Sequence, residues 1–424
     1  MSSTAKIQRH LGEKRKLPDG WRWVKLGEIA SIISKGTTPT TLGLQYTDVG
    51  IPFLRAEDVN GRAIEIDKVT FHISNDADET LARSRLLPGD FLITIAGSIG
   101  RVGYVPSEVP HLNCNQAVAF ARFDQGIVDV QYLCFVCSLE HIISPLLDQK
   151  AGGALQNLNL QQIRHLEIPL PPISEQKRIA GVLKEQMAAV GNARAAAQAR
   201  LEAVKALPAA LLRQVFPQPG QTLPDGWRWV KLGDVCMFRR GPFGGSLRKE
   251  IFVASGYAVY EQMHAIYNDF SKFRYYIDQE KFDEMRGFKV CQGDLIMSCS
   301  GTMGKVAIIP GNAPEGVINQ ALLKLTPQND ISCMFLKTCM ESANFQKNLA
   351  VLTLGAAIKN VASVGVLKAM RVPLPPLPEQ RRIAGVLKEQ MAATNKAREA
   401  AEEELDTINA LPASLLRRAF AGEL

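Results

Sequence analysis

The chain has 424 residues, of which 46% are hydrophobic, 21% charged and 7% aromatic. This composition is typical of a globular protein, excludes a collagen-like or wholly disordered chain, and leaves room for two to four domains. Lys and Arg number 49 against 42 Asp and Glu, a net charge of +7 that permits a polyanionic partner without requiring one.

Residues 1–16, MSSTAKIQRHLGEKRK, are expected to form a polar tail. They have no apolar core of the kind that a secretory signal peptide carries. No run of about 18 uninterrupted apolar residues occurs in the chain, so no membrane span is expected. The simplest expectation is a reduced, cytoplasmic protein.

Residues 17–152 are predicted to form a mainly strand-built domain with a few helices. The domain opens with LPDGWRWVKLG (17–27), in which Pro18-Asp19-Gly20 predicts a turn and WRWVKL a short strand. Cys134 and Cys137 have C-x-x-C spacing within the apolar run YLCFVCSL. No second such pair follows, and a zinc site needs four ligands, so we expect buried thiols and no metal site.

Residues 153–216 are predicted to hold a long helix followed by a short one. Ser174-Glu175 offers an N-cap just after PLPP, and the proline-free run that follows reaches Leu207. About 33 helical residues would span roughly 50 Å. The helix has an apolar stripe that needs a partner, and its candidate interface residues are Ile179, Leu183, Met187, Val190 and Leu201. Pro208 is expected to end or kink this helix.

The second half of the chain repeats the first. LPDGWRWVKLG returns unchanged at 223–233, and GDFLITIAGSIGRVGYV (89–105) is answered 204 residues later by GDLIMSCSGTMGKVAII (293–309). Asn-Gln-Ala, the helix start IPLPPISEQKRIAGVLKEQ and the ending LPxxLLRxxF are also doubled. The repeat therefore predicts a second domain over 217–355 and a second long helix with a C-terminal short helix over 356–424.

The repeated stripe of the second helix includes Ile383, Leu387 and Met391. A two-fold repeat favours an antiparallel pair, so the predicted fold class is α+β: two mainly β domains separated by a coiled-coil spacer of two long helices, with internal pseudo-symmetry. The alternative is a helical bundle packed on the β domains.

The two copies differ most at 33–85 and 239–290, and these parts are rich in groups suited to nucleic acid. Different inserts in one duplicated fold fit a protein that recognises two different things, although drift of exposed loops would also produce them. The candidate DNA-binding residues here are Lys35, Thr37, Thr38, Arg55, Arg239, Arg240, Arg248, Lys249, Lys272, Arg274 and Tyr275.

GSIGR (97–101) and GTMGK (301–305) lack the spacing of a phosphate-binding P-loop. We interpret them as tight turns that present a small hydroxyl and a cation. Ser98, Arg101, Thr302 and Lys305 are accordingly candidate contacts to the phosphate backbone, with a purely structural turn as the alternative. No Asn-Pro-Pro-aromatic tetrapeptide, nuclease cluster or ATPase motif occurs, so no catalytic residue is expected.

The chain resembles the specificity (S) subunits of type I restriction-modification systems over nearly its whole length. The resemblance is carried by the domain entry LPDGWRWVKLG, the Gly-Asp strand and turn, the Asn-Gln-Ala segment, the helix start and the LPxxLLRxxF ending. The resemblance implies one recognition domain for each half of a split double-stranded DNA target. It also implies two methyltransferase subunits and motor-nuclease restriction subunits as partners, which would supply S-adenosylmethionine, ATP and Mg chemistry, with no cofactor in this chain. The rival hypotheses are a stand-alone architectural DNA-binding protein and a fused methyltransferase or nuclease with an unrecognised site.

Overall fold

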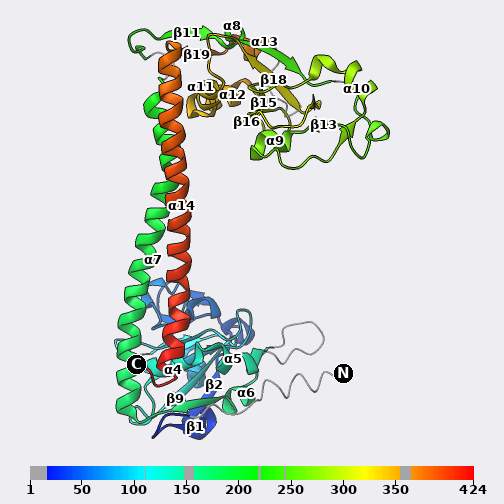
Figure 1. The fold of residues 1–424 in the computed structure, drawn as a ribbon. Coiled ribbons are helices and arrows are strands. Elements are labelled where there is room, and N and C mark those ends of the chain that lie inside the picture. Colours follow the sequence, from blue (N-terminus) through cyan, green and yellow to red (C-terminus); the bar gives the residue numbers. More distant parts are fainter. Residues whose placement is uncertain (1–16, 110, 148–156, 218–220, 243–244, 354–363) are drawn as a thin grey trace. The chain divides into compact units, whose positions relative to one another are not determined.

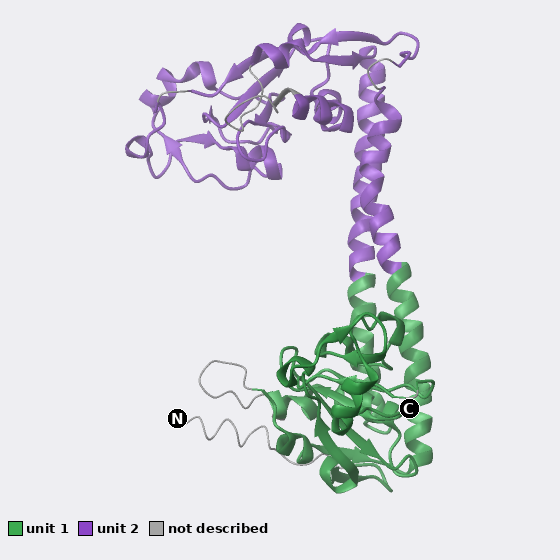
Figure 2. Cartoon of the chain, turned by 180° about the vertical axis from the view of Figure 1, so that it is seen from behind, with its two compact units in different colours: residues 1–196, 404–424 green, residues 197–403 purple. Residues whose placement is uncertain are grey.

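The computed structural model describes residues 17–109, 111–147, 157–217, 221–242, 245–353 and 364–424. The chain divides into two compact units, and each is considered by itself (Figure 2). Unit 1 consists of residues 1–196 and 404–424, and unit 2 of residues 197–403. Each unit thus combines one strand-rich domain with a segment of both long helices.

Unit 1 contains one strand-rich domain (Figure 1). Its strands are β1 (Arg22–Lys25), β2 (Ala30–Lys35), β3 (Tyr46–Thr47), β4 (Ile51–Leu54), β5 (His72–Ile73), β6 (Phe91–Thr94), β7 (Val102–Tyr104), β8 (Asn113–Cys114), β9 (Val118–Phe123) and β10 (Glu167–Leu170). Its helices are α2 (Leu26–Ile29), α3 (Asn75–Thr80), α4 (Val130–Cys137), α5 (Glu140–Leu147), α6 (Leu160–Arg164) and the first part of α7 (Ile173–Val215), with short 3-10 turns η1 (Pro39–Leu42), η2 (Ala56–Asp58), η3 (Ile66–Lys68) and η4 (Ala82–Ser84).

The central sheet of unit 1 has the strand order β2-β9-β6-β7, with every neighbour antiparallel. All four residues of β6 are buried because both faces of the sheet are covered. Phe91 and Ile93 belong to one core cluster, and Leu92 belongs to another on the opposite face. A smaller sheet, β3-β5-β4-β8, stands beside it, and in it β4 and β8 are parallel.

Unit 2 repeats this arrangement. Its strands are β11 (Arg228–Lys231), β12 (Cys236–Arg240), β13 (Tyr257–Tyr260), β14 (Tyr276–Ile277), β15 (Leu295–Ser298), β16 (Val306–Ile308), β17 (Gly316–Ile318), β18 (Leu322–Pro327) and β19 (Arg371–Leu374). Its helices are α8 (Leu232–Val235), α9 (Gln262–Tyr267), α10 (Gln279–Glu284), α11 (Cys333–Glu341), α12 (Ala343–Thr353), α13 (Val364–Ala369) and most of α14 (Leu377–Ala419), with η5 (Lys249–Ile251) and η6 (Arg286–Phe288). The central sheet is β12-β18-β15-β16, and the smaller one is β14-β13-β17, with β13 parallel to β17.

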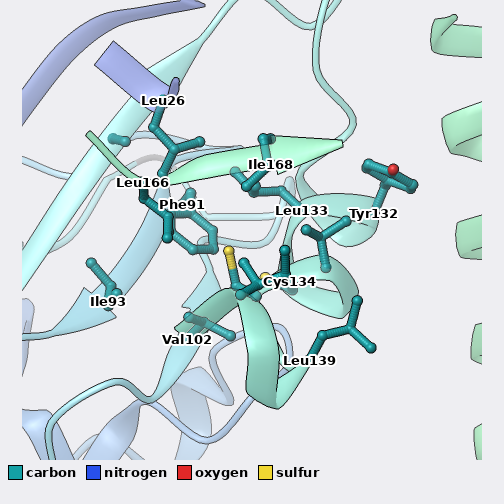
Figure 3. Packing of buried hydrophobic residues seen from close by; sticks show 14 of the residues in the cluster. Leu26, Phe91, Ile93, Val102, Tyr132, Leu133, Cys134, Leu139, Leu166 and Ile168 are labelled. Atoms are coloured by element: carbon teal, nitrogen blue, oxygen red, sulfur yellow. The ribbon is translucent and has the colours of Figure 1, made fainter. Parts of the chain in front are cut away.

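The main core of unit 1 lies between the central sheet and α4 (Figure 3). Leu133 and Cys134 of α4 lie there in one cluster with Phe91 and Ile93 of β6, whereas the Tyr132 ring contacts Phe420 with ring centres 5.6 Å apart. Cys134 and Cys137 are 4% and 2% exposed, which confirms the predicted buried thiols. Burial raises the pKa of Cys137 to about 12.

The repeated opening segment pairs with the strand that closes each strand-rich domain. The predicted turn and strand are both present: the Trp21 N–H donates to the Pro18 carbonyl at 3.1 Å, and β1 follows. β1 pairs antiparallel with β10, from Arg22 opposite Leu170 to Lys25 opposite Glu167. β11 and β19 pair in the same way in unit 2. The duplicated segment is therefore one half of a two-stranded ribbon.

This pairing lies directly before each long helix. The long helices begin at Ile173 and Leu377, just after the two PLPP segments, where the sequence predicts them to start. β10 and β19 precede those helices and belong to the strand-rich domains, because each completes a ribbon with the strand that opens its domain. Sequence periodicity alone could not show that partner.

A buried glutamine fastens each long helix to its domain. Gln176 is fully buried, its side-chain oxygen accepts from the Asp129 N–H at 2.9 Å, and its amide donates to the carbonyls of Ile127 and Pro171. In unit 2 the matching Gln380 makes the same three bonds, to Ser332, Asp330 and Pro375. The doubled Glu-Gln dipeptide thus fixes where each helix leaves its domain.

The expected helix break at Pro208 is wrong in one respect: no separate short helix forms. α7 and α14 each run for 43 residues, with Pro208 and Pro412 inside them. An interior proline costs roughly 3 kcal/mol because it lacks an N–H and its ring crowds the preceding turn. Burial of the apolar residues beyond the proline offsets that cost.

Those residues, the LPxxLLRxxF endings, pack onto the domain of the other copy. Leu416 and Ala419 belong to the main core of unit 1. Leu212 and Phe216 belong to the main core of unit 2, which they share with Leu387. Within each unit, the described segments of α7 and α14 lie side by side and antiparallel (Figure 1).

The predicted stripe of α7 and α14 is divided between these environments. Ile179 and Leu183 are buried in the core of unit 1, with Met187 packed against it, and Ile383 and Leu387 are buried in that of unit 2, with Met391 packed against it. Leu201 is 4% exposed, and Val190 is half-buried. The first turns of the stripe therefore hold the helix on its domain as well as on its neighbouring helix.

No helix in the described part of the chain is long and apolar enough to cross a membrane. Among those same residues, no group of three or more His, Cys, Asp or Glu is arranged to hold a metal ion.

Candidate nucleic-acid interface

One end of the central sheet of unit 1 gathers loops from distant parts of the chain. Because neighbouring strands alternate in direction, β2 and β6 end where β7 and β9 begin. The Gly36 N–H donates to the Val118 carbonyl at 3.0 Å, and the Ile95 N–H donates to the Ala117 carbonyl at 2.8 Å. These bonds bring residues 35–38, 95–101 and 115–117 together, and we call this surface the sheet end.

The smaller sheet delivers its own strand ends to the same place. β4 and β8 are parallel, with Leu54 opposite Cys114, and the Asn115 N–H donates to the Leu54 carbonyl at 3.0 Å. Arg55, the next residue after β4, therefore flanks the sheet end.

A glycine is required where the first of these loops leaves β2. A Cβ atom added at Gly36 would lie 2.1 Å from the Cys114 carbonyl oxygen, and one added at Gly241 would lie 1.8 Å from that of Asn319. Both oxygens belong to the backbone, so neither can move aside cheaply. The loop after β2 can therefore lie against the Asn-Gln-Ala segment only if residue 36 is a glycine, and the loop after β12 only if residue 241 is one.

Unit 2 has the same sheet end. The Gly241 N–H donates to the Leu322 carbonyl, the Cys299 N–H to that of Ala321, each at 2.9 Å. Residues 240–241, 299–305 and 319–321 meet there in consequence. Cys299 is buried beneath this surface, and burial raises its pKa to about 11 against the opposing effect of the nearby Arg240 charge.

A buried hydroxyl shapes the glycine turn of each sheet end. Thr94 Oγ1 accepts from the Arg101 N–H at 2.9 Å and donates to the Ser98 carbonyl. Ser298 Oγ accepts from the Lys305 N–H at 3.1 Å in unit 2. The turns thereby carry the side chains of Arg101 and Lys305 on the surface, where both are exposed.

The electrostatic character of the sheet end is positive in both units. No Asp or Glu occurs in the segments that form it. Among the described residues, neither Arg101 nor Lys305 lies within ion-pair distance of a carboxylate. A cation that no carboxylate neutralises, beside small hydroxyls, is suited to a phosphate group.

Many of the predicted DNA-binding residues meet at these two surfaces. They are Lys35, Thr37, Thr38, Ser98 and Arg101 in unit 1, and Arg240, Thr302 and Lys305 in unit 2. Arg55 flanks the first sheet end, and Arg274 with Tyr275 flanks the second, since Arg274 pairs with Glu261, the residue directly after β13. Lys272 is exposed in the same loop.

Three predicted residues lie elsewhere. The Arg239 guanidinium sits 5.5 Å from the centre of the Phe288 ring, over η6. Arg248 precedes η5 and Lys249 opens it, and both are exposed. The structure does not bring these three to the sheet end.

Sequence reasoning missed two features of this surface. Gln116 and Gln320 are exposed at the middle of each Asn-Gln-Ala segment. An Asx turn holds the segment, in which the Ala117 N–H donates to Asn115 Oδ1, and the Ala321 N–H donates to Asn319 Oδ1 in unit 2. The repetition of the tripeptide was the available signal. Glu261, which flanks the sheet end of unit 2, was also missed, and the hydrogen bonds that it accepts from Arg274 raise the pKa of that arginine.

A second basic area of unit 1 is largely neutralised. A hollow of about 390 Å³ beside β2 and β9 is lined by Arg83, Arg85 and Arg122. Asp78 pairs with Arg85 at 2.6 Å, and Asp90 pairs with Arg122 at 2.7 Å. Two of its three arginines are therefore committed to structural ion pairs.

The chain matches the family model described as type I restriction modification DNA specificity domain twice, over residues 18–195 and 224–406. It belongs to this family. Its function is accordingly that of a DNA specificity subunit of a type I restriction-modification system, with two recognition domains.

Similar proteins agree with this assignment. A protein of Methanocaldococcus jannaschii, provisionally named as the MjaX type I restriction enzyme specificity subunit, is 25% identical over 403 residues, 88% of this chain and 87% of that protein. The HsdS subunit of Thermoanaerobacter tengcongensis has a TM-score of 0.67 at 22% identity, covering 97% of this chain and 99% of that one. A chain from a structure concerned with complex assembly and conformational transition of the type I R-M system has a TM-score of 0.72 at 22% identity, covering 97% of this chain and 100% of that one. At these identities the structures show the shared fold.

Proposed function

We propose that each unit binds one half of a split duplex target through its sheet end, and that the chain carries no active site or cofactor of its own. The observation that supports this proposal is the pair of acid-free, cationic sheet ends, which occupy the same place in both units. DNA presents regularly spaced phosphates, and their neutralisation contributes strongly to binding.

The comparison of the two copies supports a division of this surface into residues for the phosphate backbone and residues for the bases. The Gly-x-x-Gly turn with its cation, and the Asn-Gln-Ala segment, are alike in both units. Residues shared by two readers of different sequences are suited to the phosphate backbone, which is the same everywhere. The neighbouring residues that differ between the copies are suited to base edges.

A similar argument supports a duplicated protein partner. Lys184 and Glu185 of α7 are exposed, as are Lys388 and Glu389 at the matching positions of α14. Solvent-exposed helix positions have no need to remain identical for folding. We propose that these helix starts contribute to docking two adenine methyltransferase subunits, with restriction subunits joining the complex. S-adenosylmethionine, ATP and Mg would then serve those partners.

The assignment of the sheet end is tested by Arg101→Gln and Lys305→Gln, measured as DNA affinity against salt concentration in the assembled methyltransferase complex. Each lost phosphate contact should weaken binding to all sequences alike and make the slope of log K against log salt shallower by about 1. Arg83→Gln, an exposed arginine in η4, is the matched control. Unchanged affinity and salt slope in both variants would place the DNA elsewhere.

The absence of an active site is tested by incubating the purified chain with DNA and S-adenosylmethionine. We expect no methyl transfer until methyltransferase subunits are added. Transfer by the chain alone would contradict this part of the proposal.

A further inference from the structure

The residue that directly follows the parallel strand pair carries opposite charge in the two units. Arg55 follows β4, and Glu261 follows β13. The two positions are structurally equivalent, because the residue before each accepts the same hydrogen bond from the parallel neighbouring strand. The Asn115 N–H donates to the Leu54 carbonyl, and the Asn319 N–H donates to the Tyr260 carbonyl.

An aromatic residue also occupies an equivalent position beside each sheet end. Phe71 precedes β5, and its carbonyl accepts from the Phe53 N–H at 2.8 Å. Tyr275 precedes β14, and its carbonyl accepts from the Val259 N–H at 3.0 Å. Each ring therefore lies next to the strand that ends in Arg55 or Glu261.

In unit 1 the arginine comes from the parallel strand. The Arg55 guanidinium carbon lies 4.5 Å from the centre of the Phe71 ring, and Glu57 pairs with the same guanidinium at 3.0 Å. The side chain of Arg55 remains 37% exposed. It is thus held by a ring and a carboxylate while still open to a ligand.

In unit 2 the arginine comes from the other side. Arg274 precedes Tyr275, and its guanidinium carbon lies 5.5 Å from the centre of that ring. Glu261, now on the parallel strand, accepts two hydrogen bonds from Arg274 at 2.6 and 3.0 Å. The Arg274 side chain is 62% exposed.

The segment that carries Arg274 is itself held in place. Tyr275 stacks on Phe252 with ring centres 4.4 Å apart, and Phe273 stacks on His264 at 4.5 Å. His264 is fully buried, and its ring nitrogen hydrogen-bonds the Lys272 carbonyl at 3.0 Å. An arginine fixed in this way loses little freedom when it binds a ligand.

We infer that Arg55 and Arg274 each read one guanine of their half-site in the major groove. The inference rests on the proposed function and identifies residues that distinguish the half-sites. Random drift would lose an arginine without supplying another beside the equivalent ring. Here both units keep a guanidinium beside that ring, although it comes from Arg55 in one unit and from Arg274 in the other. A guanidinium has five N–H donors, so a carboxylate that takes two leaves enough for the O6 and N7 acceptors of guanine.

A different origin gives each guanidinium a different approach to the bases. A phosphate contact would not require this exchange, since Arg101 and Lys305 already supply the shared cations. Arg55 and Arg274 therefore fit the discriminating part of the surface rather than its common part.

The test uses the assembled methyltransferase complex and a DNA library randomised in both half-sites, with methylated sequences read out. The wild-type complex first defines the bipartite target. Arg55→Ala should lower the preference for guanine at one position of one half-site by about 10- to 100-fold and leave the other half-site unchanged. Arg274→Ala should do the same in the opposite half-site.

Arg55→Lys and Arg274→Lys keep the positive charge and the ion pair but lose the two-pronged donor geometry, so they should also lose the preference. If thermal unfolding shows that an alanine variant is not folded, the lysine variant takes its place in the test. Arg83→Gln should change nothing in the recognised sequence.

A uniform loss of methylation across all sequences, or an unchanged target, would overturn the inference, because the first outcome marks a phosphate contact and the second no contact. Failure of the proposed function looks different: the wild-type complex itself would then show no sequence preference.

Discussion

Single side chains explain why the two copies remain similar where they do. Gln176 and Gln380 are kept because each bonds three backbone groups, and Gly36 and Gly241 because a backbone oxygen occupies the space of a side chain. These identities were visible in the sequence, but their reasons were not. A repeated residue indicates a shared requirement, and only the fold shows whether that requirement is structural or concerns a ligand.

The glutamine fastening gives a prediction for stability. Gln176→Ala should lower the free energy of unfolding by about 2–4 kcal/mol, because it leaves the Asp129 N–H and the Ile127 carbonyl without their partner. Chemical denaturation of the purified chain measures this change. Gln198→Ala, on the exposed surface of α7, should change stability little. Equal effects of the two substitutions would contradict the role given to Gln176.

Cysteine reactivity offers a second check at this scale. Burial raises the pKa of Cys137 and Cys339 to about 12, so below that pH their thiolate fraction in the native state is small. Iodoacetamide at pH 8 should therefore label the exposed Cys291 readily and leave Cys137 and Cys339 unlabelled until the protein is unfolded. Peptide mass spectrometry reads the sites. Rapid native labelling of Cys137 would show that this core opens easily.

At the scale of elements, local patterns predicted the types of structure better than their ends. The proline stop, the acidic first turn and the apolar stripe of α7 predicted a long helix, and one is present. Its C-terminal end was misplaced because Pro208 is a strong local signal, whereas the packing of Leu212 and Phe216 is a long-range contact. The partner of β1 was hidden for the same reason, since β10 lies more than 140 residues away.

The proline inside α7 leads to a prediction of increased stability. Pro208→Ala restores an N–H donor and removes the crowding of the preceding turn, and should stabilise the protein by about 1–3 kcal/mol. Pro412→Ala in α14 should act in the same direction. Thermal unfolding of both variants checks this. A lower transition temperature would mean that the proline fits a local distortion that the protein needs.

At the scale of the whole molecule, the sequence showed the duplication and its two kinds of region, and the family confirms the two recognition domains. It could not show that the end of each copy packs into the domain of the other. Leu416 and Ala419 complete the core of unit 1, and Leu212 and Phe216 that of unit 2. Each sequence repeat is one continuous segment of the chain, but each compact unit contains residues of both repeats.

This exchange predicts that a substitution in one copy weakens the domain of the other. Phe216→Ala should cost about 3–5 kcal/mol, because Phe216 is 2% exposed and contacts Phe335 with ring centres 5.5 Å apart. Hydrogen exchange should quicken in β15 and α11 and remain unchanged in β6 and α4. Leu207→Ala, at an exposed position of α7, is the control. Faster exchange in β6 instead would contradict this assignment.

The same packing means that unit 1 cannot complete its fold until the end of the chain has been synthesised. Unit 2 is one continuous stretch of chain, whereas unit 1 needs residues 404–424, which are made about 200 residues after the rest of it. At 5–20 residues per second, the ribosome takes roughly 10–40 s to supply them. Until then Leu183 and its neighbours lack Leu416 and Ala419, and Arg178 lacks the Leu424 carbonyl that it meets at 2.7 Å. The half of the protein that emerges first is therefore the half that is finished last.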